Sequence, residues 1–211
     1  MRKILGASIA LVMTMRTPWQ QLALVLAIAA TSLPAIAQTP APQSSGIDAA
    51  LLAKANAGDP AAQVLVGESY AAGGGVARDL NQAAEWYRKA AGKNDISGEL
   101  HLAALYRDGG KGFLRDMEQA ATWYRKAAEQ GDVSAQATIG LLYSLGQGVL
   151  KDDLEAYFWL DLAASVKGPR QEQYAANRQL IGTHITTDEL EEVQERVAKW
   201  QAAHPSPADP K

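Results

Sequence analysis

The chain has 211 residues, with 20 Lys and Arg against 23 Asp and Glu, and it contains no cysteine. The absence of cysteine excludes disulfides, thiol catalysis and cysteine-ligated zinc sites. A mildly acidic chain gives no electrostatic footprint for nucleic acid or anionic lipid, so we expect neither as a partner.

Residues 1–37 are typical of a secretory signal peptide. Arg16 supplies a basic start, Leu22–Ala30 is a short apolar run, and the small-x-small sequence A-I-A ends at Ala37. This pattern predicts cleavage between Ala37 and Gln38. A cleaved product would be periplasmic or secreted, with no remaining membrane insertion.

Two features of this segment leave alternatives open. Met15 followed by Arg16 would start a complete signal by itself, so Met15 is a candidate for the true initiator. An uncleaved membrane anchor that also uses Ile4–Met13 is the alternative to cleavage.

The next residues lead into the folded part of the chain. Residues 38–47 are rich in Pro and Ser, which predicts a flexible leader. Residues 48–58 form a predicted capping helix that begins after Asp48 and carries Leu51 and Leu52 on one side. We expect this helix to cover the open edge of the repeats that follow.

An internal repeat then organises the chain. Trp86, Trp123 and Trp159 recur at intervals of 37 and 36 residues, a spacing typical of stacked-repeat proteins. The predicted units are residues 59–94, 95–131 and 132–168. Each unit reads as two helices, A and B, joined by a glycine-containing turn. Because one unit cannot bury its own apolar face, we expect the tryptophans to pack between neighbouring units.

The clearest B helix is the stretch from Asp116 to Asp132. Asp116 can cap its start, and Gly131 can adopt the left-handed conformation that ends a helix. Its apolar positions share one helical face and are Ala120, Trp123, Tyr124, Ala127 and Ala128.

The C-terminal part predicts an end cap. Residues 169–203 contain two amphipathic helices, the second of which opens with a capping box of Thr186 and Glu189. Residues 204–211 contain three prolines and predict a disordered tail.

The repeated pattern resembles the Sel1-like repeat family, which is related to the tetratricopeptide repeats. In the first unit the matching residues are Ala62, Val66, Gly67, Tyr70, Gly73, Gly75, Val76, Asp79, Ala83, Trp86, Tyr87, Lys89, Ala90 and Ala91. The third unit departs at Tyr157 and Leu160, where Ala and Tyr are typical of the family. The resemblance implies an all-α, right-handed α/α solenoid of helical-hairpin repeats with helical end caps. It also implies a protein-binding scaffold with a concave face lined by A helices and with no catalytic residues.

The residues themselves support no catalytic, metal or cofactor site. His101, His184 and His204 are scattered, and no Glu or His follows His101 at a spacing of four. The glycine turns recur in every unit and lack the strand–turn–helix context of a phosphate loop. We therefore expect no enzyme activity and no cofactor.

The A-helix positions that packing does not use form the candidate protein-binding groove. They are Val64, Glu68, Leu100, His101, Ala104, Arg107, Thr138, Leu141 and Ser144. Their mixed apolar and polar character suits an extended peptide or a partner helix. The alternatives are that this face is only solvated surface, or that the convex B-helix face binds instead.

We therefore expect a monomeric, non-enzymatic scaffold of the bacterial cell envelope that holds a protein or peptide partner. Two alternatives remain open at this point. One is an envelope enzyme, or a β-lactam- or peptidoglycan-binding protein like the cysteine-rich relatives of the family, although those relatives carry a disulfide in each repeat. The other is a sensor or regulator of envelope state.

The signal peptide generates the first prediction. After expression with export, intact-mass measurement should show a product that begins at Gln38. A product that keeps Met1 or Met15 and fractionates with membranes would instead indicate an anchor.

Overall fold

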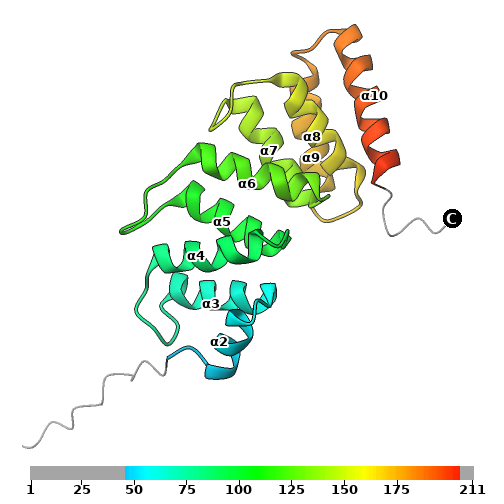
Figure 1. The fold of residues 1–211 in the computed structure, drawn as a ribbon. Coiled ribbons are helices and arrows are strands. Elements are labelled where there is room, and N and C mark those ends of the chain that lie inside the picture. Colours follow the sequence, from blue (N-terminus) through cyan, green and yellow to red (C-terminus); the bar gives the residue numbers. More distant parts are fainter. Residues whose placement is uncertain (1–45, 205–211) are drawn as a thin grey trace, which may run out of the picture. The chain divides into compact units, whose positions relative to one another are not determined.

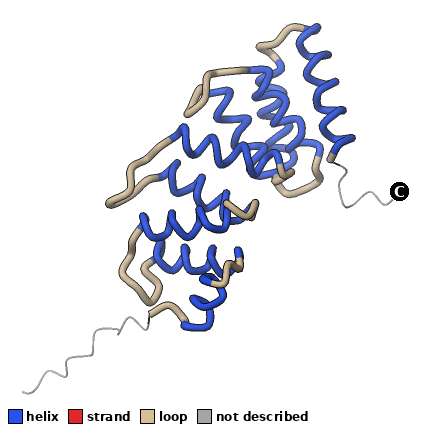
Figure 2. Tube along the Cα trace, in the orientation of Figure 1, coloured by secondary structure: helices blue, strands red, loops and turns tan. Residues whose placement is uncertain are grey.

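The computed structural model describes residues 46–204, and the part of the chain that it describes is helical apart from turns and one isolated bridge between Gly110 and Phe113 (Figure 2). The helices are α2 (Ala49–Asn56), α3 (Pro60–Ala72), α4 (Leu80–Ala91), α5 (Ile96–Asp108), α6 (Met117–Glu129), α7 (Val133–Leu145), α8 (Asp153–Ser165), α9 (Gln171–Gly182) and α10 (Thr187–Ala203). The predicted signal peptide, residues 38–45 of the predicted leader and residues 205–211 of the predicted tail lie outside the described residues.

The helices pack in the order of the sequence, as helical hairpins. The A helices α3, α5 and α7 alternate with the B helices α4, α6 and α8, and each helix contacts the next (Figure 1). Helix α2 packs on α3, while α9 and α10 both pack on α8. This arrangement confirms the predicted all-α solenoid of helical-hairpin repeats.

Aspartates fix where the repeat helices begin. In all six, the carboxylate of an N-cap Asp accepts a hydrogen bond from a backbone N–H of the first turn. These caps are Asp59, Asp79, Asp95, Asp116, Asp132 and Asp152. Replacing such a cap by Ala typically costs about 1 kcal/mol. The cap of α10 is the capping box of Thr186 and Glu189.

The repeated tryptophans occupy the core to different degrees. Trp86 and Trp159 are buried, as expected for packing between units. Trp123 is only partly buried, although it packs against the cores on both sides of it. The Lys126 ammonium lies 4.0 Å from the centre of the Trp123 ring, and the Lys89 ammonium lies 3.6 Å from that of Trp86, so both rings make a cation–π contact. Trp123 therefore packs between two units, as expected, but part of its side chain stays exposed.

The fourth residue of each A helix is a buried polar side chain. The Gln63 amide donates to the Ala55 carbonyl at 3.0 Å, and the Gln136 amide donates to the Ala128 carbonyl at 3.3 Å. In both cases the acceptor lies eight residues earlier, on the preceding helix. Each amide thus joins one unit to the previous one through a hydrogen bond in the interior.

The second unit has a carboxyl group at this position. Glu99 is 1% exposed, and the Gln130 amide donates to its Oε2 at 2.7 Å. Burial raises the pKa of Glu99, and the nearby charge of Lys126 offsets part of this rise. The equivalent acceptor is the Ala91 carbonyl, and an ionised carboxylate has no proton to donate to it.

Glu99→Gln should therefore stabilise the protein near neutral pH by about 1 kcal/mol, because an amide can donate where a carboxylate cannot. Since the pKa of Glu99 is higher in the folded chain than in the unfolded chain, the folded state holds more protons above pH 4.5. Its contribution to the free energy of unfolding falls as pH rises through that window. The gap between variant and wild type should widen with pH in denaturant titrations.

The reverse change, Gln136→Glu, is the matched control at the equivalent position of the third unit. It should lower stability at neutral pH and add the pH dependence that Glu99→Gln removes. If the free energies of unfolding of Glu99→Gln and wild type differed by the same amount at every pH, Glu99 would not titrate in this way.

A glycine allows the close contact between α4 and α5. A Cβ added to Gly98 would lie 2.7 Å from the Ala90 Cβ and 2.8 Å from the Ala91 backbone nitrogen. The backbone atom cannot move aside as a side chain can, so this spacing depends on glycine.

We expect Gly98→Ala to destabilise the protein by about 1–2 kcal/mol, because the clash outweighs the better helix propensity of Ala. Thermal or denaturant unfolding would measure the loss. Gly168→Ala is the control, since a Cβ there would meet nothing within 4 Å. Equal midpoints for the two variants would contradict the close-contact explanation.

Candidate functional site

Val64 does not belong to the candidate groove. It was predicted on the free face of its A helix, but it is 6% exposed and packs in a core cluster with Ala83 and Tyr87. The neighbouring Leu65 is 49% exposed instead. One residue turns a side chain by about 100° around a helix, so the pattern had the correct helix and the wrong face. Leu100 is half-buried and also packs against the core.

The exposed A-helix face contains other predicted residues and two that the sequence analysis missed, Leu65 and Leu145. We call it the A-helix surface and define it as Leu65 and Glu68 of α3, His101, Ala104 and Arg107 of α5, and Thr138, Leu141 and Leu145 of α7. Leu141 is 38% exposed and Leu145 is 64% exposed. Spacings of three and four residues along each helix were the signal that could have identified Leu65 and Leu145.

Glu68 and His101 are in polar contact between the first two A helices. The Glu68 Oε1 lies 3.0 Å from the His101 Nε2, and the Nδ1 of the same ring lies 2.8 Å from the Ser97 carbonyl oxygen. A neutral imidazole donates to one of these two acceptors, and a doubly protonated imidazole donates to both. The centre of the His101 ring also lies 5.0 Å from the centre of the Tyr87 ring. Burial, and to a lesser extent the charge of Glu68, raises the pKa of Tyr87 to about 12.

Arg107 is held by two neighbours on the second unit. Its guanidinium makes two hydrogen bonds to the Asp108 carboxylate, at 2.7 and 2.9 Å, and a third to the Tyr124 hydroxyl at 3.0 Å. The hydrogen bond to Arg107 lowers the pKa of Asp108, so both groups are charged at neutral pH. A partner therefore meets a fixed ion pair here and not a free cation.

Helix α7 presents mostly apolar atoms on this surface. The Thr138 hydroxyl donates to the Ser134 carbonyl at 2.7 Å, and the Ser144 hydroxyl donates to the Leu141 carbonyl at 2.9 Å. Both hydroxyls are thus satisfied within their own helix. What remains free on α7 is the aliphatic surface of Leu141 and Leu145.

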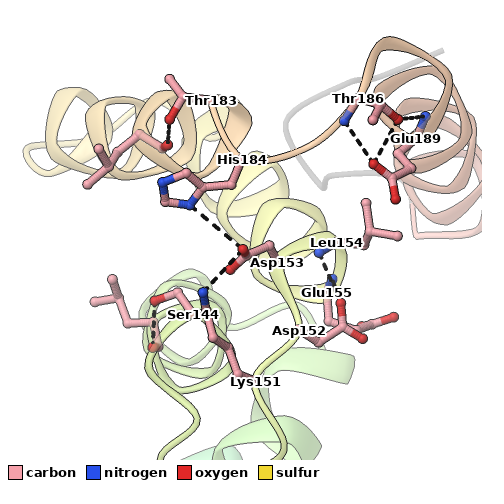
Figure 3. Close-up of polar contacts among 12 residues, drawn as sticks. Ser144, Lys151, Asp152, Asp153, Leu154, Glu155, Thr183, His184, Thr186 and Glu189 are labelled. Carbon is pink, nitrogen blue, oxygen red and sulfur yellow. Dashed lines mark hydrogen bonds and ion pairs between the residues drawn. The ribbon is translucent and has the colours of Figure 1, made fainter.

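Polar residues also gather around Asp153 at the start of α8. Its Oδ2 lies 3.4 Å from the Lys151 ammonium and 3.7 Å from the His184 Nδ1. Figure 3 shows both groups converging on Asp153, while the Ser144 hydroxyl is bonded to its own helix. Because His184 follows α9, this contact attaches the end of α9 to α8, and its role is structural.

Between residues 46 and 204, no group of three or more His, Asp or Glu side chains could hold a metal ion. Within the same range, no helix combines the length and the apolar character needed to cross a membrane.

Comparisons with known proteins agree with the fold. The Sel1 repeat model matches residues 60–95, 96–132 and 133–165. A Sel1 repeat protein from Oxalobacter formigenes, known from a crystal structure, is 34% identical with a TM-score of 0.56, over 62% of this chain and 52% of that one. No curated protein matches the chain.

A second solved structure is a protective antigen of uropathogenic Escherichia coli strains that displays an SLR fold. It is 20% identical over 76% of this chain and 52% of that one, with a TM-score of 0.38, which is too low to compare their sites. The chain spans about half the length of both solved structures, 52% in each case. The Sel1 repeat matches, in contrast, cover half of the chain and coincide with its stacked helical hairpins, and the chain therefore belongs to the Sel1 repeat family.

Proposed function

We propose that this protein is a non-enzymatic scaffold of the cell envelope that binds a protein partner through its A-helix surface. Sel1 repeat proteins typically mediate protein–protein interaction, and their fold is generally non-catalytic. The partner of each Sel1 repeat protein depends on the side chains that its repeats leave exposed. The exposed side chains of this chain are therefore the guide to its partner.

The distribution of exposed large hydrophobic residues supports the A-helix surface. In the described residues these are Leu65, Leu114, Leu141, Leu145, Leu150, Val166 and Leu180. None of them lies on the B helices α4, α6 or α8, whereas three belong to the A-helix surface as defined above. Exposed aliphatic side chains that recur on one face are typical of an interaction surface. This observation favours the A-helix face over the B-helix face.

The chemistry of the surface indicates the kind of partner. Leu141 and Leu145 offer an aliphatic patch at the third unit, while the pair of Glu68 and His101 and the pair of Arg107 and Asp108 offer fixed polar groups at the first two. An amphipathic helix or an extended segment with aliphatic side chains at one end and hydrogen-bonding groups at the other fits this arrangement. Location in the cell envelope and a monomeric state are part of the proposal, and location depends on the signal peptide predicted over residues 1–37.

Site-specific photo-crosslinking tests the proposal. A photoreactive amino acid replaces Leu65 or Leu145 in the full chain, which is expressed in its native cells. Control variants carry the same amino acid at Glu85 or Gln119, which are exposed on the B helices. We expect discrete protein adducts from the first two positions and few from the controls. Adducts concentrated at Glu85 and Gln119 would assign binding to the B-helix face.

A substitution separates binding from folding. Leu145→Asp should remove the adduct formed from Leu65, because a charge replaces an aliphatic contact on the same surface. Since the Leu145 side chain is 64% exposed, the free energy of unfolding should change by no more than about 0.5 kcal/mol. An adduct from Leu65 that persists at the wild-type yield would exclude Leu145 from the interface.

A further inference from the structure

A second candidate site lies where the α6–α7 turn faces the loop between α8 and α9. A pocket of about 700 Å³ opens there. Its walls come from segments more than 30 residues apart in the sequence, the stretch from Gln130 to Ser134 and the stretch from Val166 to Gln171. Ile96 and Tyr174 complete the lining. None of these residues was predicted from the sequence to bind a ligand.

The rim of the pocket is basic. Lys167 and Arg170 are both exposed and line the pocket, and neither forms an ion pair with a carboxylate of the described residues. The one acidic residue of the lining is Asp132, whose carboxylate is engaged as the cap of α7, accepting from the Ala135 N–H at 2.7 Å. The charge that faces an incoming ligand is therefore positive.

The walls beneath this rim are largely apolar. Ile96, Val133 and Tyr174 are half-buried, and Pro169 and Val166 are exposed beside them. The amide of Gln171 is directed away from a ligand, because it donates to the Ala164 carbonyl at 3.1 Å. Aliphatic contact at the walls and anion pairing at the rim can thus be made by one ligand.

We propose that this pocket binds an acidic peptide segment, with an aliphatic side chain against Val133 and Tyr174 and carboxylates paired with Lys167 and Arg170. The volume is within the usual range for ligand pockets, about 300–1,000 Å³. The loop from Lys167 to Arg170 is exposed throughout, so the site is open along one side and admits a continuing chain. Its positive charge stands out on a chain with 23 acidic against 20 basic residues, and this complementarity selects an acidic ligand.

This site is distinct from the A-helix surface and does not depend on it. The two share α5 and α7 but no residue. Ile96 and Ser134, near the starts of these helices, line the pocket, and the A-helix surface begins at least one turn later, at His101 and Thr138. Variants of Lys167 and Arg170 change no residue of the A-helix surface, so the two proposals can fail separately.

The experiment uses the full chain and a fluorescein-labelled peptide, Leu-Asp-Glu-Leu-Asp-Glu, with binding measured by fluorescence anisotropy. We expect saturable binding that weakens at high salt. The double variant Lys167→Glu with Arg170→Glu should weaken it by about tenfold or more. The matched control is Lys54→Glu with Lys111→Glu, which makes the same change in net charge at two exposed lysines outside the pocket and should bind as wild type does.

Ser134→Trp provides a test that leaves the charges unchanged, since a bulky ring on the exposed Ser134 would fill the pocket. It should also weaken binding, with an unchanged thermal midpoint. The proposal would be overturned if the Lys54 and Lys111 control lost as much peptide affinity as the Lys167 and Arg170 variant. It would also be overturned if a peptide with Lys in place of Asp and Glu bound as tightly as the acidic peptide. Tighter binding after Asp209→Ala would also overturn it, because residues 205–211 of the chain itself would then be the occupant.

Discussion

One hydrogen bond recurs between repeats, from an arginine on a B helix to a tyrosine hydroxyl on the next A helix. Arg88 donates to Tyr106 at 3.0 Å, and Arg125 donates to Tyr143 at 2.6 Å. Both tyrosine rings pack against the core, so their hydroxyls need a partner at the edge of it. The arginine provides that partner across the boundary between two units.

The third unit uses the same position with donor and acceptor exchanged. Arg88 and Arg125 are 37 residues apart, and 36 residues after Arg125 stands Asp161, which pairs with Arg178 of α9. Here the B helix supplies the acceptor and the following helix supplies the donor. The C-terminal cap is therefore attached at the position that joins repeats, through an ion pair in place of an arginine–tyrosine hydrogen bond.

Local sequence signals were sufficient to predict the helices. They were not sufficient to predict the contacts between units. Asp116 and Gly131 mark the ends of α6 because capping and left-handed backbone are properties of a few adjacent residues. The rotation that buries Val64 and exposes Leu65 is set by how α3 packs on α4, which no local pattern records. The pairing of Glu68 with His101 depends on the displacement between two units for the same reason.

The pocket was beyond sequence reasoning because its two walls meet only after α9 folds back onto α8. The position of its basic rim then depends on the contacts that hold the C-terminal cap. Arg178 joins α9 to Asp161, and Arg196 of α10 pairs with Glu155 while its guanidinium lies 4.8 Å from the centre of the Phe158 ring. These side chains all approach α8, so α8 is the common support of the cap.

Helix α7 links the two proposed binding regions. Ser134, at its start, lines the pocket, and Leu141 and Leu145, toward its end, belong to the A-helix surface. A partner that used both would place its aliphatic contacts along α7 and its carboxylates at the loop before α9. Because α7 and α9 each pack on α8, the geometry presented to such a partner is fixed by one helix and its buried face. Rigid support of this kind lowers the entropic cost of binding, since little needs to be ordered on the protein side.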